Sequence, residues 1–109
     1  MNREELIAFC LTFPGAYVDY PFDEEWTTLR HGDNKRCFAF IFERWDTLCI
    51  NLKCEPMEAD LLRGSFSAVI PGYHMNKRHW NTVLLNGTVP QPEVERMIAL
   101  SFELTGKKR

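Results

Sequence analysis

The sequence predicts a single α/β (α+β) domain over residues 1–109, in which an antiparallel sheet carries the N- and C-terminal helices on one face. Three observations lead to this fold class. The length of 109 residues suits one domain, with 45% hydrophobic residues, close to the globular average. Amphipathic helical patterns occupy both ends of the chain, and strand-like runs joined by short turns fill the middle. Short turns join antiparallel neighbours, on which amphipathic helices can pack.

The first helix is predicted to begin after Asn2. Asn2 and Glu5 form a capping-box pattern, because the Glu5 carboxylate can reach back to the backbone N–H of Asn2. Apolar side chains then recur at helical spacing, at Leu6, Phe9, Cys10 and Phe13. Pro14 and Gly15 end this helix, and the acid-rich residues 14–25 are predicted to form a loop.

Three strands are predicted in the middle of the chain, at residues 26–31, 36–42 and 47–53. The turns between them lie at 32–35 and 43–46. The second strand is apolar on both faces and is therefore expected at the centre of the sheet. The third strand alternates, with Leu48, Ile50 and Leu52 on one face and Cys49, Asn51 and Lys53 on the other. We expect the terminal helices to cover one face of the sheet and the other, partly polar face to stay open.

The second half of the chain begins with a short helix, predicted over residues 56–64. Its apolar stripe would consist of Met57, Leu61 and Leu62. Residues 68–70 and 80–85 indicate one or two further strands. The last helix is predicted to begin at Pro90 or Pro92 and to end at Gly106.

Charge does not by itself mark this chain as a nucleic-acid-binding protein. Thirteen basic and fifteen acidic residues give a net charge of −2, whereas such proteins are usually basic. The distribution is uneven: residues 1–25 carry one base and six acids, residues 26–53 carry five bases and three acids, and residues 70–89 carry two bases and no acid. The centre of the chain and the segment after residue 70 are therefore its electropositive parts.

The four cysteines are predicted to be free. No two have the C-x-x-C spacing, and Cys10, Cys37 and Cys49 lie in apolar runs that suit core packing. Cys54 follows Lys53 at the end of a predicted strand, so a reactive thiol is left open there.

The cellular setting is predicted from what the sequence lacks. No apolar stretch approaches the ~20 residues of a membrane span, and the acids near the N-terminus argue against a secretory signal. We expect a cytoplasmic protein with no membrane contact and no cofactor, and favour a monomer.

The segment Pro71-Gly72-Tyr73-His74-Met75-Asn76-Lys77-Arg78-His79-Trp80-Asn81-Thr82-Val83 resembles the MmcQ/YjbR family. Residues 13–17, 52–56 and 101–104 are also similar to that family, so the resemblance spans essentially the whole chain. It implies a frataxin-like (CyaY-like) sheet and a double-wing DNA-binding role.

That role suggests non-catalytic, weak binding of double-stranded DNA with little sequence readout. Lys77 and Arg78 can neutralise phosphates, and the other polar side chains of residues 73–79 can bind phosphate or sugar. The turns at 32–35 and 43–46 would be the wings, and Lys53 would join the basic loop. The candidate residues are Lys35, Arg36, Arg44, Lys53, Tyr73, His74, Asn76, Lys77, Arg78 and His79.

A purely structural role for the same residues is an alternative. In that interpretation Trp80 and Met75 fill the core, and the histidines bond to backbone groups. Trp45 either stacks on a base or folds back over the sheet edge.

Three other functions remain open. A protein or a small ligand could bind the open sheet face. A frataxin-like protein could handle metal, but His74, His79 and Cys54 match no standard zinc spacing, and no metal site is predicted. Catalysis by Cys54 with one of these histidines and Glu55 has no motif in its favour, so no catalytic residue is predicted.

Overall fold

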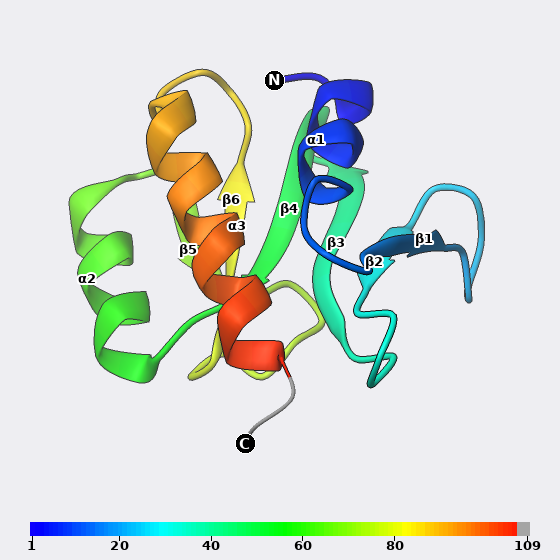
Figure 1. Cartoon of the computed structure of the whole chain (residues 1–109). Helices are drawn as coiled ribbons and strands as arrows, with labels where there is room; N and C mark the ends of the chain where they lie inside the picture. Colours follow the sequence, from blue (N-terminus) through cyan, green and yellow to red (C-terminus); the bar gives the residue numbers. More distant parts are fainter. Residues whose placement is uncertain (107–109) are drawn as a thin grey trace.

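The computed structural model describes residues 1–106, which form a six-stranded antiparallel sheet with three helices (Figure 1). The elements are α1 (Arg3–Cys10), β1 (Tyr17–Asp19), β2 (Thr27–Arg30), β3 (Cys37–Arg44), β4 (Thr47–Lys53), α2 (Pro56–Ser65), β5 (Val69–Pro71), β6 (Trp80–Leu84) and α3 (Gln91–Thr105). The strand order is β1-β2-β3-β4-β6-β5. The predicted α+β fold class is confirmed, and β3 and β4 lie at the centre of the sheet.

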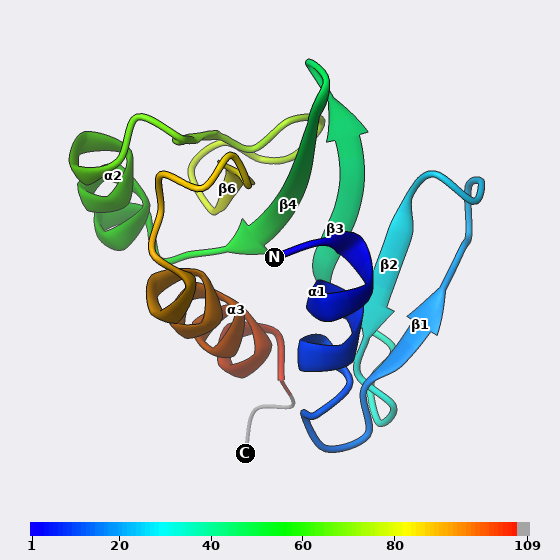
Figure 2. The ribbon, with the colours of Figure 1, turned by 90° about the horizontal axis from the view of Figure 1, so that it is seen from above.

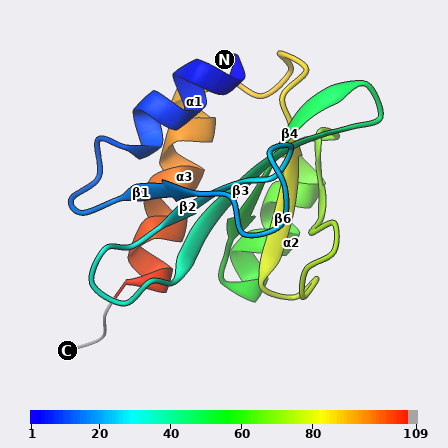
Figure 3. The same ribbon diagram turned by 90° about the vertical axis from the view of Figure 1, so that its right-hand side faces the viewer.

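The register of the strands defines two faces. Ile50 of β4 lies between Ile41 of β3 and Val83 of β6, and these side chains belong to the buried core. Helices α1 and α3 lie on the same side of the sheet (Figures 2 and 3), and we call this side the helix face. One residue along β4, Asn51 pairs with Phe40 and Thr82. Because side chains alternate along a strand, these residues belong to the opposite side, which we call the open face.

The N-terminal region corrects the prediction in two places. Residues 14–25 were expected to form a loop, but Tyr17–Asp19 form the short edge strand β1, whose Asp19 carboxylate pairs with Arg30 at 2.8 Å. The capping box at Asn2 is present, but α1 ends at Cys10. Phe13 nevertheless joins the core margin and stacks on Phe102 of α3 with ring centroids 4.8 Å apart.

The apolar stripe predicted for α2 is wrong in two of its three residues. Met57 and Leu61 are 87% and 63% exposed, whereas Ala59 and Leu62 are buried. A helix of ten residues has apolar side chains at more than one plausible spacing. The neighbours of α2, which the local pattern does not contain, decide which side faces inward.

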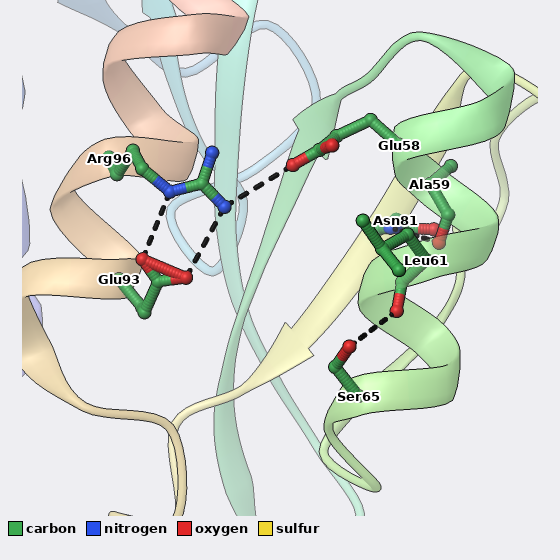
Figure 4. A network of polar contacts seen from close by, with 7 residues as sticks. All are labelled: Glu58, Ala59, Leu61, Ser65, Asn81, Glu93 and Arg96. Carbon is green, nitrogen blue, oxygen red and sulfur yellow. Dashed lines mark hydrogen bonds and ion pairs between the residues drawn. The ribbon is translucent and has the colours of Figure 1, made fainter.

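Polar contacts join α2 to the sheet and to α3 (Figure 4). The Asn81 amide of β6 donates to the carbonyl of Ala59 at 3.3 Å, and Arg63 donates to Asn81 Oδ1 at 2.7 Å. Arg96 of α3 pairs with Glu58 of α2 at 3.2 Å. These contacts hold α2 beside the β5–β6 edge.

The cysteines belong to the packed interior, as predicted for three of them. Cys10, Cys49 and Cys54 are buried and Cys37 is half-buried, and all four are free. Burial raises the pKa of the Cys10 thiol to about 12. Among the helices of residues 1–106, none is long and apolar enough to cross a membrane.

A buried histidine connects the end of α3 to the turn that precedes β3. His31 Nε2 lies 2.8 Å from Thr105 Oγ1, and the ring stacks on Phe102 with centroids 4.1 Å apart. The Asn34 amide donates to the Thr105 carbonyl at 3.0 Å. Burial lowers the pKa of His31, and the nearby charge of Asp33 opposes this shift only in part.

The lowered pKa predicts that acidification weakens the fold through His31. The unfolded chain takes up a proton on this side chain near pH 6.5, before the folded chain does. The contribution of His31 to stability is therefore present above that pH and is lost as the pH falls through the lower folded-state pKa. We expect the melting temperature of the wild type to fall more steeply from about pH 7.5 to pH 5 than that of His31→Gln. Parallel profiles would contradict this role.

Candidate functional site

The loop at residues 72–79 crosses the open face and is held there by buried polar side chains. The Tyr73 N–H donates to Thr82 Oγ1 at 2.8 Å, and the Asn51 amide donates to the Tyr73 carbonyl at 2.9 Å. The Thr82 hydroxyl donates in turn to Asn51 Oδ1. Asn51 and Thr82 are fully buried, so the expectation that this face stays open is wrong at its centre, where the loop covers it.

Glycine is required where the loop leaves β5. The Gly72 N–H donates to the Trp80 carbonyl at 2.9 Å. A Cβ at position 72 would lie 2.8 Å from Trp80 Cβ and 3.0 Å from Met75 Cβ, which is too close for any other residue. Trp80 and Met75 are half-buried and lie outside the buried core, so the expectation that they fill it is wrong. The Trp80 ring instead packs near Phe40 on the open face, with centroids 5.8 Å apart.

Two predicted phosphate ligands bond within the loop itself. Lys77 Nζ donates to the Gly72 carbonyl at 2.8 Å, and Asn76 Oδ1 accepts from the Arg78 N–H at 2.9 Å. The Arg63 guanidinium of α2 binds the Lys77 carbonyl. Asn76 and Lys77 therefore shape the loop, whereas no hydrogen bond or ion pair of the Arg78 side chain is present within residues 1–106.

Basic side chains from three segments meet at one end of the sheet. In the β3–β4 hairpin Ala39 pairs with Leu52, so the turn before β3 lies at the end where β4 stops. Lys53 pairs with Trp80, which places the end of the 72–79 loop there too, and Figure 1 shows both segments at the lower end of the sheet. We define the basic end as Lys35, Arg36, Lys53, Lys77, Arg78 and His79. It also contains Asp33, and Glu55 and Glu103 line a hollow with Lys53 and His79.

The two predicted wings lie at opposite ends of β3. Turns that follow one another in a meander alternate between sheet ends, and the eight residues of β3 span about 26 Å. Arg44 is therefore far from Lys35 and Arg36, and one compact ligand cannot contact both turns. The structure divides the candidates into the basic end, a second group on the open face (Arg44, Tyr73 and His74), and Asn76, which bonds within the loop.

The second group lines a cleft of about 470 Å³, which we call the aromatic cleft. Its walls include Trp26, Phe40, Phe42 and Tyr73. Trp26 stacks on Phe42 with ring centroids 4.3 Å apart and an interplanar angle of 8°, and Tyr73 stacks on Phe42 at 5.7 Å. Sequence reasoning placed Trp26, Phe40 and Phe42 in strands without assigning them a site. The shared face of Phe40 and Phe42 was readable from the alternation in β3, but their meeting with Trp26 and Tyr73 was not.

The β3–β4 turn completes the cleft with a cation and a tryptophan. Trp45 and Asp46 both have φ of 55°, the left-handed geometry of a tight hairpin turn. The Arg44 guanidinium carbon lies 5.2 Å from the ring centroid of Tyr73 and 5.8 Å from that of Trp45. Trp45 meets Tyr73 edge-on at 5.4 Å and is 53% exposed. Trp45 packs against Tyr73 rather than over a sheet edge, and about half of the side chain faces solvent.

The geometry gives little support to the catalytic and metal-binding hypotheses. Burial and the neighbouring Glu58 raise the pKa of Cys54, which disfavours the thiolate that a nucleophile needs. Among residues 1–106 no three His, Cys, Asp or Glu side chains converge as metal ligands. In the acidic segment, Asp19 pairs with Arg30, and Asp23 accepts from the N–H groups of Glu25 and Trp26.

Comparisons with known proteins agree on one family. The YjbR family model matches residues 11–104. The uncharacterized protein YyaQ of Bacillus subtilis is 32% identical over 117 residues, which cover 96% of this chain and 98% of YyaQ. The uncharacterized protein YjbR of Escherichia coli K12 is 33% identical over 103 residues, which cover 94% of this chain and 86% of that protein.

Solved structures give the same result for the fold. The Deinococcus radiodurans protein DR2400 is similar with a TM-score of 0.88 and 33% identity, over 96% of this chain and 78% of that one. A Pseudomonas syringae protein is similar with a TM-score of 0.86 and 32% identity, over 97% of this chain and all of that one. The likeness therefore extends over nearly the whole chain in sequence and in structure.

Two threonines on the open face provide a matched test of the loop anchor. Thr82 takes part in two hydrogen bonds that hold the loop, whereas Thr28 Oγ1 is buried without a partner within residues 1–106. Thr82→Val should lower the free energy of unfolding by about 1–3 kcal/mol, because it leaves buried polar groups unpaired. Thr28→Val should leave it unchanged or raise it. Urea unfolding of both variants checks this, and equal losses would contradict the assigned anchor.

Proposed function

The chain belongs to the YjbR family, and on this premise we propose that it is a non-catalytic protein that binds duplex DNA through its basic end. The observation that carries the proposal is that Lys35 and Arg36 lie at the same end of the sheet as Lys53 and the 77–79 segment, although 17 residues or more of sequence separate these groups. Convergent cations of this kind form an electrostatic surface for phosphates.

The proposed mode of binding is phosphate neutralisation. Arg36 and Arg78 are exposed, and a guanidinium can donate two parallel hydrogen bonds to one phosphate. Lys53 adds a charge beside them, and Lys77 keeps the loop in shape. No element of the basic end is an exposed helix that could enter a major groove, so little base readout is expected. The nearby acids Asp33, Glu55 and Glu103 reduce the attraction, which makes the proposed binding weak and sensitive to salt.

A second candidate function is the binding of a small ligand in the aromatic cleft. The observation in its favour is a concave site of about 470 Å³ whose apolar walls carry a few charged groups, which is the usual composition of a small-molecule site. This function uses the open face and does not depend on the basic end.

Salt-dependent binding to a labelled random duplex tests the DNA proposal. Fluorescence anisotropy at about 50 mM and about 200 mM salt should show affinity that falls by an order of magnitude or more. The double variant Arg36→Ala with Arg78→Ala should weaken binding and reduce the slope of log K against log salt by roughly two units, because each phosphate contact contributes about one.

Arg44→Ala is the matched control, because Arg44 lies at the other end of β3. It removes one arginine charge, half of what the double variant removes, and should leave the slope unchanged. Absence of binding at the lower salt concentration, or an equal effect of Arg44→Ala, would overturn the proposal.

A further inference from the structure

We propose that the aromatic cleft binds an organic ammonium ion, a compact cation with apolar substituents. This inference rests on the second candidate function above, because it names the chemical class of the small ligand. It is independent of DNA binding at the basic end. Three properties of the cleft support it: the arrangement of its rings, a cation of the chain that already lies against two of them, and the charges along its rim.

The rings of the cleft expose aromatic surface to solvent-accessible space. Phe22, which also lines the cleft, is 72% exposed, and Trp26 and Tyr73 are only partly buried. Trp26 lies 6.4 Å from Tyr73 with an interplanar angle of 18°, whereas it meets Phe40 at 68°. A group that enters the cleft therefore meets the exposed aromatic surface of these rings. Ring faces carry the negative side of the aromatic quadrupole and attract cations.

Arg44 provides an example of this attraction inside the site. Its guanidinium carbon lies within 6 Å of the ring centroids of Tyr73 and Trp45, the range of cation–π contact. The cleft therefore already holds one positive charge of the chain against its rings. Phe22, Trp26 and His74 line the same cleft.

The rim selects the sign of the ligand charge. Asp23 and Glu25 contribute two carboxylates, against one guanidinium from Arg44. The Glu25 carboxylate forms no hydrogen bond or ion pair with any residue of 1–106, so no side-chain partner neutralises it there. A nucleotide or another anionic ligand would bring like charge to this rim. A cation gains both Coulomb attraction from the carboxylates and cation–π attraction from the rings.

The test compares choline with its neutral isostere, 3,3-dimethylbutan-1-ol. Both probes have the same shape, and only choline carries a charge. Titrations of the folded protein up to about 20 mM are followed by the indole N–H signals of the three tryptophans in ¹H–¹⁵N spectra, because weak ligands have millimolar dissociation constants. We expect choline to shift the Trp26 signal and to bind at least ten times more tightly than the alcohol.

Charge variants locate the effect. Glu25→Gln should weaken choline binding several-fold and leave the alcohol unaffected, because it removes a charge and keeps the side-chain size. Glu24→Gln is the matched control: Glu24 is exposed in the same segment but does not line the cleft. Arg44→Gln should strengthen choline binding, since it removes the competing cation.

The outcomes distinguish the ammonium assignment from the more general small-ligand function. Equal binding of choline and the alcohol would overturn the ammonium assignment and support a small-ligand cleft without charge selection. No shift of the Trp26 signal by either probe would overturn the ammonium assignment and remove the support for the small-ligand function. Choline binding that Glu24→Gln weakens as much as Glu25→Gln would place the cation outside the cleft and overturn the assignment as well.

Discussion

The hydrogen bonds that Asn51 and Thr82 make with the backbone of Tyr73 are the interaction on which both candidate surfaces depend. They take a loop that leaves β5 at the edge of the sheet and fix it across the centre of the open face. Both side chains are fully buried, and a buried polar group that loses its partner costs about 1–3 kcal/mol. Because these buried groups would cost stability without partners, their hydrogen bonds fix the position of the loop.

The same loop contributes to two surfaces of opposite character. Its first residues, Tyr73 and His74, turn toward the acidic rim of the aromatic cleft. Its last residues, Lys77 to His79, reach the basic end beside Lys53. The uneven charge along the chain thus becomes a separation in space, since the acids of residues 23–25 lie on the cleft side and the bases of residues 35–36 lie beyond the other end of β3. A net charge near zero conceals this division.

Much of the buried core lies on the helix face, away from both candidate surfaces. Leu6, Ile50 and Ile98 are fully buried there, and α3 closes on the β2–β3 turn through His31 and Thr105. Changes on the open face can therefore alter binding without removing this core. Strand β4 is the exception, because its side chains alternate between the core and the loop anchor. Ile50 packs in the core, whereas its neighbour Asn51 holds the loop.

The sequence by itself determined the elements whose signals are local. Asn2 and Glu5 predicted the start of α1, the turns at 32–35 and 43–46 predicted the central hairpins, and the periodicity after Pro90 predicted α3. Only the tertiary structure decided the three-residue strand β1, the inward side of α2, the separation of Arg44 from the basic end, and the meeting of Trp26, Phe42 and Tyr73. The reason is the range of the forces involved. A cap or a periodic stripe acts within a few residues, whereas edge pairing, burial and ring stacking depend on partners that lie about ten to fifty residues away in the sequence.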